Sequence, residues 1–263
     1  MIEIAPHQLP ALGRWFPTGS PGPGAMAEHV LSTGNGRWWA DRPDKPRVLA
    51  AACADHVLLR GDPGALDPDG LARFADRYVE APARFWPALG STFERVAPWE
   101  RMTYVHQAQA RVSVPRSPRG VTVRRLTPED AQALARLESE HAWIHASWGG
   151  PGGLAASGHG WAAFAKGRIL SVACTYFLGS AYEDIAVVTV PDRRRERLAL
   201  ACVGGLTADI RARGRGASWC CSRENRPSRL LAWTAGFRLT REYVHLATGR
   251  APARELPATP VSA

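Results

Sequence analysis

The residues best placed for chemistry surround a basic turn between an apolar run and a helix. The β-branched stretch 187–190 ends at Pro191, and the arginine-rich turn 193–197 follows it. A helix is predicted next because apolar residues recur every four positions, at Leu198, Cys202, Leu206 and Ile210. Free backbone N–H groups and the positive end of the helix dipole would then face the turn. Strand, basic turn and helix together predict a phosphate-binding site.

Two motifs in this part of the chain carry a family resemblance. Arg194–Ala199 matches the first and last positions of Gln/Arg-x-x-Gly-x-Gly/Ala, and the segment from Asn225 to Phe237 is similar to Asn-x-x-Ser/Ala…Gly-Phe. Both motifs belong to the GCN5-related N-acetyltransferase (GNAT) superfamily, which the chain resembles from Val121 to Leu246. Segments 147–150, 158–161 and 167–173 resemble the subgroup that has an added N-terminal half.

The resemblance implies an α/β (α+β) protein with the GNAT fold, in which helices flank a mixed, mostly antiparallel central sheet. We expect a smaller α/β half over 1–114, a linker over 115–120 where turn-forming and basic residues cluster, the GNAT acyltransferase domain over 121–250 and a flexible tail over 251–263. One hypothesis makes the first half a degenerate GNAT-like copy, although no sequence repeat supports it.

The elements that must position these motifs follow from apolar periodicity and turn residues. In the first half we predict a loop over 17–24, one or two strands over 48–59, helices over 67–78 and 82–93, and an extended segment over 102–114. In the second half we predict strands over 121–126, 161–164, 169–177, 182–190, 217–222 and 243–247, with the closing helix over 228–235. Thr127 and Asp130 predict a capping box at the first helix of that half.

The donor site is implied by the resemblance. Backbone N–H groups of the strand before the turn would hold the pantetheine arm of acetyl-CoA, which places Val188 and Val190 beside it. Further cofactor contacts are implied at Arg194, Arg195, Arg197, Leu198, Ala199, Asn225 and Ser228. The central glycine of the signature is Arg197 here. Its guanidinium either binds a phosphate directly or obstructs the close backbone approach that glycine allows.

Two adjacent carboxylates are candidates for the general base. Glu183 lies at the position before Arg194 where one branch of the family places its base, and Asp184 points to the opposite face of the strand. A carboxylate in a partly dry cleft has a raised pKa, which favours proton abstraction. We expect Glu183 to act as the base ahead of Asp184. The alternative is that Glu183 caps the strand end in solvent.

The general acid is harder to place. The tyrosine that protonates the leaving thiolate in many family members would fall at Ala232, so another group is needed. We expect Ser228 or Tyr243 to take this role, since both lie in the corresponding part of the chain, together with His245 and Cys221. The alternative role of Ser228 is a hydrogen bond with Asn225 at the helix start.

Acceptor contacts are implied for the segment after the first helix of the second half. Trp143, His145 and Trp148 lie there, and their rings could stack on a flat or cationic acceptor. The alternative is that they pack between the two halves. No Cys-x-x-Cys pair or ordered histidine cluster occurs, so we expect no metal.

Composition limits the remaining choices. The net charge is +9, and residues 191–215 hold seven arginines against three acidic residues, a local charge of +4. Such a patch suits a polyphosphate cofactor or a tRNA backbone. The chain has no apolar run long enough to span a membrane, no signal-peptide pattern and five scattered cysteines, so we expect a cytoplasmic monomer or homodimer.

Three functions are compatible with these features. The first is an acetyl-CoA-dependent N-acyltransferase that acts on the primary amine of a small molecule or amino-acid-like acceptor. The second is a transferase on the same fold whose donor is an aminoacyl-tRNA, as the basic turn and Arg197 would allow. The third is a non-catalytic binding module that lost the acid and the loop glycine. We rank them in this order.

Overall fold

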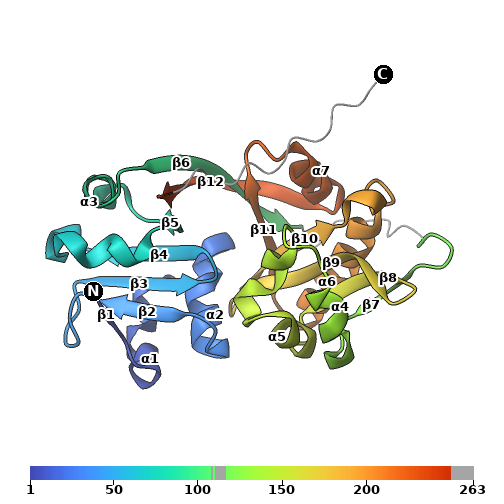
Figure 1. Cartoon of the computed structure of the whole chain (residues 1–263), viewed down its shortest axis with the longest axis horizontal. Coiled ribbons are helices and arrows are strands. Elements are labelled where there is room, and N and C mark those ends of the chain that lie inside the picture. The colour runs from blue at the N-terminus through green and yellow to red at the C-terminus, as the bar shows by residue number, and fades with distance from the viewer. Residues whose placement is uncertain (108, 110–116, 250–263) are drawn as a thin grey trace.

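A computed structural model of the chain describes residues 1–107, 109 and 117–249 (Figure 1). Its strands join into one twelve-stranded sheet in the order β1-β2-β3-β4-β5-β12-β6-β11-β10-β9-β8-β7. Helices cover both faces of this sheet. None of the helices in the described ranges is long and apolar enough to cross a membrane.

The first half contributes six strands, three α-helices and several 3₁₀ turns. The strands are β1 (Ile2–Glu3), β2 (Arg37–Ala40), β3 (Val48–Cys53), β4 (His56–Gly61), β5 (Tyr78–Glu80) and β6 (Val96–His106). The α-helices are α1 (Leu9–Leu12), α2 (Ala25–Thr33) and α3 (Trp86–Thr92). The 3₁₀ turns are η1 (Pro6–Gln8), η2 (Gly13–Trp15), η3 (Gly22–Gly24), η4 (Pro63–Ala65), η5 (Pro68–Phe74) and η6 (Ala83–Phe85).

The second half contributes the other six strands and four α-helices. The strands are β7 (Thr122–Arg125), β8 (Gly160–Ala165), β9 (Arg168–Leu178), β10 (Tyr182–Thr189), β11 (Gly216–Ser222) and β12 (Phe237–Thr248). The helices are α4 (Ala131–Ala135), α5 (Pro151–Ala156), α6 (Leu198–Ala212) and α7 (Arg226–Thr234). The 3₁₀ turns are η7 (Pro128–Asp130), η8 (Ala142–Trp148) and η9 (Pro191–Arg193).

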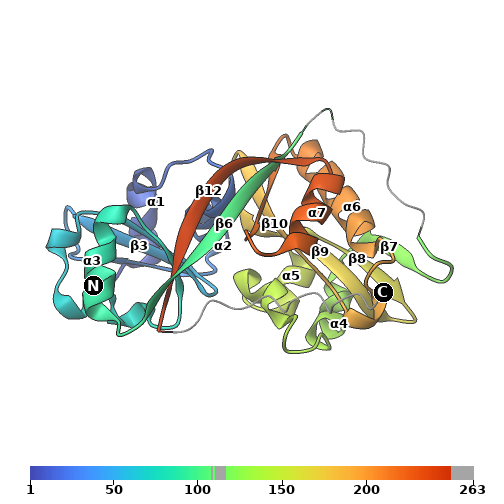
Figure 2. The ribbon, with the colours of Figure 1, turned by 90° about the horizontal axis from the view of Figure 1, so that it is seen from above.

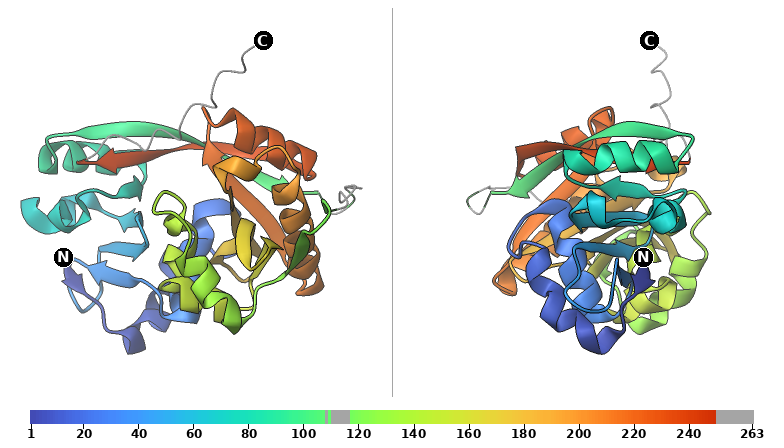
Figure 3. Two further views of the ribbon diagram at one scale, coloured as in Figure 1. Left: turned by 45° about the vertical axis from the view of Figure 1, so that its right-hand side comes forward. Right: turned by 90° about the vertical axis from the view of Figure 1, so that its left-hand side faces the viewer.

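The two halves exchange their long strands. In each half an antiparallel run of strands is followed by a parallel pair, β4 with β5 in the first and β10 with β11 in the second. The strand that follows β5 along the chain, β6, pairs with β11, whereas β12 pairs with β5. β6 and β12 also pair with each other, and they run together from one half to the other (Figures 2 and 3). The two halves thus have the same strand order when each is followed inward from its own edge of the sheet. This symmetry supports the hypothesis that the first half is a degenerate copy.

Apolar side chains on the two faces of the sheet form separate cores. One core lies under α6 and α7 and includes the predicted helix face, Leu198, Cys202, Leu206 and Ile210, each at most 2% exposed. The opposite face packs on α4, η8 and α5 in the second half and on α2 in the first. Adjacent residues of β10 alternate between these cores, since Val187 belongs to the first and Val188 to the second.

Most predicted elements are confirmed, with shifts of up to six residues at their ends. Residues 108 and 110–114 of the extended segment predicted over 102–114 lie outside the described residues. The capping box forms, since the Asp130 carboxylate accepts from the Thr127 N–H at 2.8 Å. The helix predicted over 67–78 is wrong: a 3₁₀ segment ends at Phe74 and a strand begins at Tyr78. Helix α2 was not predicted, because the adjoining loop prediction was based on proline and glycine alone.

The expected linker over 115–120 joins two halves that share strands. Residues 115 and 116 of the expected linker and the tail 251–263 lie outside the described residues. β6 precedes the linker, yet it is hydrogen-bonded to β11 of the second half. The first half therefore supplies part of the sheet on which the candidate site is built.

Candidate functional site

The candidate site lies where β10 and β11 diverge. These parallel strands pair only from Tyr182–Gly216 to Ile185–Trp219. β10 continues to Thr189 and β11 to Ser222, but beyond that point their residues no longer pair with each other. The backbone edges that would have completed the pairing are therefore left available near the carboxyl ends of the strands.

Only alternate residues of β10 turn their backbone toward β11. The Val190 N–H donates to the Leu170 carbonyl at 2.9 Å, on the side of β9. The backbone N–H of Val188, two residues earlier, points in the same direction, and Val188 pairs with Val172 of β9. The N–H groups of Val187 and Thr189 therefore point toward the diverging strand. This corrects the expectation for the backbone N–H groups of both Val188 and Val190, which point toward β9 and not toward the diverging strand.

The basic turn keeps three cationic groups in solvent. Its two acidic residues are already paired, Asp192 with Arg168 at 2.9 Å and Glu196 with Arg193 at 2.7 Å. Within the described residues no ion pair involves Arg194, Arg195 or Arg197, and all three are exposed. These arginines stand before the first turn of α6, where unpaired N–H groups and the helix dipole favour an anion.

The turn has a backbone conformation that suits glycine. Arg195 and Arg197 have φ angles of 69° and 61°, in the left-handed region, and Arg197 is the N-cap of α6. The family signature places glycine at position 197, where a residue without Cβ adopts these angles freely. Arg197 therefore keeps the conformation that the signature requires and adds a cationic side chain to it.

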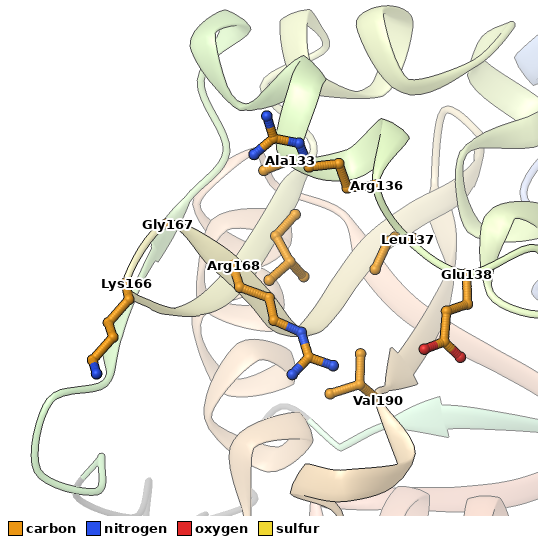
Figure 4. Close-up of a pocket in the computed structure, with 9 residues that line it drawn as sticks. Ala133, Arg136, Leu137, Glu138, Lys166, Gly167, Arg168 and Val190 are labelled. Atoms are coloured by element: carbon orange, nitrogen blue, oxygen red, sulfur yellow. The ribbon is translucent and has the colours of Figure 1, made fainter.

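A small pocket adjoins this turn (Figure 4). It has a volume of about 220 Å³ and lies between the end of α4, the β8–β9 turn and the end of β10. Leu137, Ile169 and Val190 line it, with Arg136 and Arg168 at its edge. Because Arg168 is paired with Asp192 of the turn, this pocket lies directly beside the arginine-rich turn.

One group of metal-ligand residue types occurs in the described part of the chain, and it lies beside this pocket. Potential ligand atoms of Glu138, Glu140 and His141 lie within 4.8 Å of one another. Glu138 and Glu140 are exposed, and the Nδ1 atom of His141 lies 3.5 Å from the Glu140 carboxylate. Exposed acidic groups of this kind are common without an ion, and we assign no metal site to them.

Glu183 is fully buried within a set of ion pairs on the α6 side of the sheet. Its carboxylate accepts two hydrogen bonds of 2.8 Å from Arg213 and one of 3.2 Å from Arg215. Thr175 also donates to it, and His159 lies 3.6 Å away. Burial alone would raise the pKa of Glu183, but the neighbouring His159 ring and the hydrogen bonds from Arg213 and Thr175 outweigh it and hold that pKa well below its ordinary value. Such a carboxylate is a weak proton acceptor.

Asp184 occupies a different environment on the opposite face. Its Oδ1 atom accepts a hydrogen bond of 2.8 Å from the Ser218 hydroxyl. The Ser218 hydroxyl oxygen in turn accepts one of 3.0 Å from the Gly22 N–H. Burial raises the pKa of Asp184 to about 6, although hydrogen bonds from Ser218 and Cys220 and the charge of Arg101 act to lower it. A carboxylate with that pKa is a suitable general base near neutral pH.

Tyr243 approaches the same face from β12. The phenol lies beside the Cys220 thiol and close enough to Asp184 and Arg101 for their charges to shift its pKa. Burial raises the pKa of Tyr243 well above its ordinary value, so the phenol keeps its proton at neutral pH. Burial also lowers the pKa of His245, the next ring on this face of β12, well below its ordinary value, and the imidazole is therefore neutral.

Ser228 lies on the other face of the sheet, at the start of α7. Its hydroxyl accepts a hydrogen bond of 3.0 Å from the Trp219 indole, and its N–H donates to the Asn225 side chain at 2.9 Å. Ala232, at the position of the family's tyrosine, is fully buried in the core under α7. The structure thus places Tyr243 with Asp184, and it places neither Ser228 nor Glu183 beside them.

The three predicted acceptor residues have different surroundings. Trp148 is 8% exposed, donates from its indole to the Thr175 carbonyl at 2.7 Å and stacks on His159. His145 is half-buried, and burial lowers its pKa. Trp143 is 45% exposed and contacts the ring of Tyr176. Trp143 is therefore the one of the three that presents a large open surface.

Comparison with known proteins places this geometry in a family. The family model described as GNAT acetyltransferase matches residues 22–246. A Streptomyces virginiae protein named as an uncharacterised N-acetyltransferase in the mutA 5′ region is 62% identical over 217 residues, which cover 82% of this chain and 91% of that protein.

Two solved structures show the same fold at low identity. A GCN5-related N-acetyltransferase-like protein from Streptococcus suis 89/1591 superposes with a TM-score of 0.71 at 19% identity, covering 92% of this chain and 98% of that one. A tandem GNAT protein from the clavulanic acid biosynthesis pathway has a TM-score of 0.59 at 14% identity, covering 95% and 98%.

Proposed function

The chain belongs to the GNAT acetyltransferase family, and from that premise we propose that it transfers the acetyl group of acetyl-CoA to the primary amine of a small molecule. The observation that carries the proposal is the divergence of β10 and β11 immediately before an arginine-rich turn at a helix N-terminus. This arrangement offers one continuous path for a thioester arm and its phosphates.

The donor would lie along the diverging edge of β10. Arg194, Arg195 and Arg197 would hold its phosphates together with the first N–H groups of α6, since charge-assisted hydrogen bonds to phosphate are the strongest available there. The N–H groups of Val187 and Thr189 would hold the arm and polarise the acetyl carbonyl. These contacts position the donor before any proton moves.

Asp184 is the proposed general base. In the transfer a C–N bond forms between the acceptor amine and the acetyl carbon, and the C–S bond of the thioester breaks. The amine proton passes to the Asp184 carboxylate, directly or through one water molecule. The leaving thiolate takes a proton from the Tyr243 phenol, which lies on the same face as Asp184.

Glu183 then has a positioning role. Its bonds to Arg213 and Arg215 tie the start of β10 to the end of α6, and its bond to Thr175 ties β10 to β9. These contacts fix the strand just before the point of divergence. Ser228 fixes the start of α7 in a similar way, through Asn225 and Trp219.

An aminoacyl-tRNA donor is the second candidate. The three exposed, unpaired arginines before α6 that would bind the phosphates of acetyl-CoA would also bind an RNA backbone. Ribonuclease treatment distinguishes the two donors. Ribonuclease treatment of the donor abolishes a tRNA-dependent reaction and leaves an acetyl-CoA-dependent reaction unchanged.

The test is a turnover assay with purified protein, acetyl-CoA and a set of small primary amines. We expect release of free CoA thiol and a product mass increased by one acetyl group, with no effect of ribonuclease. Arg194→Ala should lower turnover at sub-saturating donor by about tenfold or more, since one hydrogen bond to a charged group contributes about 1.5–3 kcal/mol. The matched control is Arg14→Ala, which removes an exposed arginine from η2 in the first half. Turnover that needs tRNA would overturn the proposal.

A further inference from the structure

Six rings from both halves of the chain form one connected surface on the Asp184 face of the sheet. Ring centroids lie 5.8 Å apart for Trp143 and Tyr176, and 6.2 Å apart for Tyr176 and His56. His245 lies 5.3 Å from His56, 6.1 Å from Trp99 and 5.1 Å from Tyr243. We call this surface the aromatic wall: Trp143, Tyr176, His56, Trp99, His245 and Tyr243.

The aromatic wall is partly open to solvent. Trp143 is 45% exposed, and His56, Trp99 and Tyr243 are each partly exposed. Tyr176 and His245, at 7% and 3%, form its backing. Contiguous accessible rings are unusual on a protein surface unless they bind something, because each would otherwise be more stable in a core.

One end of the aromatic wall reaches the proposed reaction centre. Tyr243 lies beside Cys220 and within electrostatic reach of Asp184. Arg101, which also faces Asp184, stacks on Trp99 with its guanidinium carbon 4.1 Å from the ring centroid. A molecule lying against the wall would thus have one end next to the groups that carry out the transfer.

The charges beside the wall limit the kind of molecule that fits. Arg101 stacks on Trp99, whereas Arg241, 4.9 Å from the ring centroid of Tyr243, is paired with Glu80 at 3.7 Å. The carboxylate near Tyr176, Asp55, is paired with Arg77 at 2.9 Å. The positive charge of Arg101 disfavours a polycationic acceptor such as a linear polyamine, and it favours the neutral, nucleophilic form of a single amine.

We propose that the aromatic wall binds the acceptor, and that this acceptor is a primary amine carried on a flat aromatic or heteroaromatic ring. The ring would stack against Trp143, the most exposed ring of the wall, while the amine reaches toward Asp184. This inference rests on the proposed acetyl transfer and adds the class of substrate. It also gives the first half a function, since His56 and Trp99 belong to β4 and β6.

The test compares two acceptors that differ only in the ring. 2-Phenylethylamine and 2-cyclohexylethylamine have the same carbon skeleton and the same amine, but only the first is flat and aromatic. We expect kcat/KM with acetyl-CoA to be about five- to tenfold higher for 2-phenylethylamine, as expected for aromatic stacking. Trp143→Ala should reduce this preference to about twofold or less, with the KM for acetyl-CoA unchanged.

The chain offers a matched control. Trp86, in α3, is 46% exposed, nearly the same as Trp143, but it is not part of the aromatic wall. Trp86→Ala should leave both the preference and kcat/KM unchanged. Equal kcat/KM for the two amines in wild type, a preference that survives Trp143→Ala, or turnover of only non-aromatic amines would overturn the acceptor assignment while acetyl transfer stands. Failure to bind acetyl-CoA would instead overturn the proposed function itself.

Discussion

The side chains of Glu183 and Asp184, neighbours in the chain, are held in opposite electrostatic states on opposite faces of β10. Glu183 is surrounded by the donors of Arg213, Arg215 and Thr175, which keep it ionised. Asp184 is buried beside Ser218 and Cys220, and its pKa is raised to about 6. Because their pKa values differ in this way, Asp184 is suited to accept a proton near neutral pH and Glu183 is not.

Glu183→Gln should affect stability more than chemistry. Removing the carboxylate leaves Arg213 and Arg215, with side chains 27% and 30% exposed, without their partner. We expect a loss of about 3 kcal/mol in the free energy of unfolding, measured by urea denaturation, because a broken buried ion pair leaves uncompensated charge. The exposed pair of Glu3 and Arg37 provides the control, and Glu3→Gln should cost well under about 1 kcal/mol.

The same Glu183 variant separates the two candidate bases. At a temperature where Glu183→Gln is folded, we expect its kcat to stay within about threefold of wild type, since loss of a general base costs about 10²–10⁴-fold. A loss of that larger size in a folded protein would return the role of base to Glu183.

Asp184→Asn should remove the general base. We expect kcat to fall by about 10²-fold or more, with binding of acetyl-CoA retained. In wild type the rate should decline as pH falls through about 6, where Asp184 takes up a proton and stops accepting one from the amine. The measurement is the pH dependence of kcat for both proteins. An acid limb that persists unchanged in Asp184→Asn would show that another group titrates there.

His29 should make the fold sensitive to mild acid. It is fully buried, with Nδ1 accepting from the Leu178 N–H at 3.1 Å and Nε2 donating to the Ser147 carbonyl at 2.8 Å, so it joins α2 of the first half to the second half. Burial is the main cause that lowers the pKa of His29 from its ordinary value of 6.5. Below that value the unfolded chain binds a proton that the folded chain does not, so stability falls as pH falls.

The size of this effect is measurable in a variant. Below pH 6.5, we expect the unfolding free energy of His29→Gln to depend less steeply on pH than that of wild type. The slopes should differ by up to about 1.4 kcal/mol per pH unit, which corresponds to the uptake of one proton. Asp184 acts in the opposite direction, since its raised pKa lets the folded state take up a proton first. The exposed His7 is the control, and His7→Gln should leave the slope unchanged. Equal slopes in His29→Gln and wild type would contradict this account.

Arg197 should show the cost of its backbone conformation. Both Arg197→Gly and Arg197→Ala remove the guanidinium, but only glycine adopts a φ of 61° freely. We expect the glycine variant to be more stable than the alanine variant by about 1 kcal/mol in thermal or urea unfolding. The reverse order would mean that the turn does not hold a left-handed residue at this position in solution.

The sequence predicted the second half of the fold well because its signals are local. The spacing of Leu198, Cys202, Leu206 and Ile210 and the capping box at Thr127 each depend on a few neighbouring residues. The exchange of β6 and β12 could not be predicted, since pairing between Arg101 and Ser222 is set by tertiary packing across a long stretch of chain.

The candidate site was only partly accessible to sequence reasoning for the same reason. The arginines before α6 stand next to one another in the chain, so their role could be inferred from order alone. The choice between Glu183 and Asp184 depends on Arg213, Ser218 and Arg101, which come from three separate elements. His56 and Trp99 carried no local signal for an acceptor site, because they become neighbours of His245 only after strand exchange.

The most direct test of the central claim is calorimetric titration of the wild-type protein with acetyl-CoA. We predict a Kd on the order of 10 μM and a loss of about tenfold or more in affinity for Arg194→Ala, as removal of a charged hydrogen bond requires. Arg14→Ala should bind as wild type does. No heat from wild type, with binding gained in Arg197→Gly, would contradict the account, because the turn would then exclude coenzyme A and a different donor or a binding role would take its place.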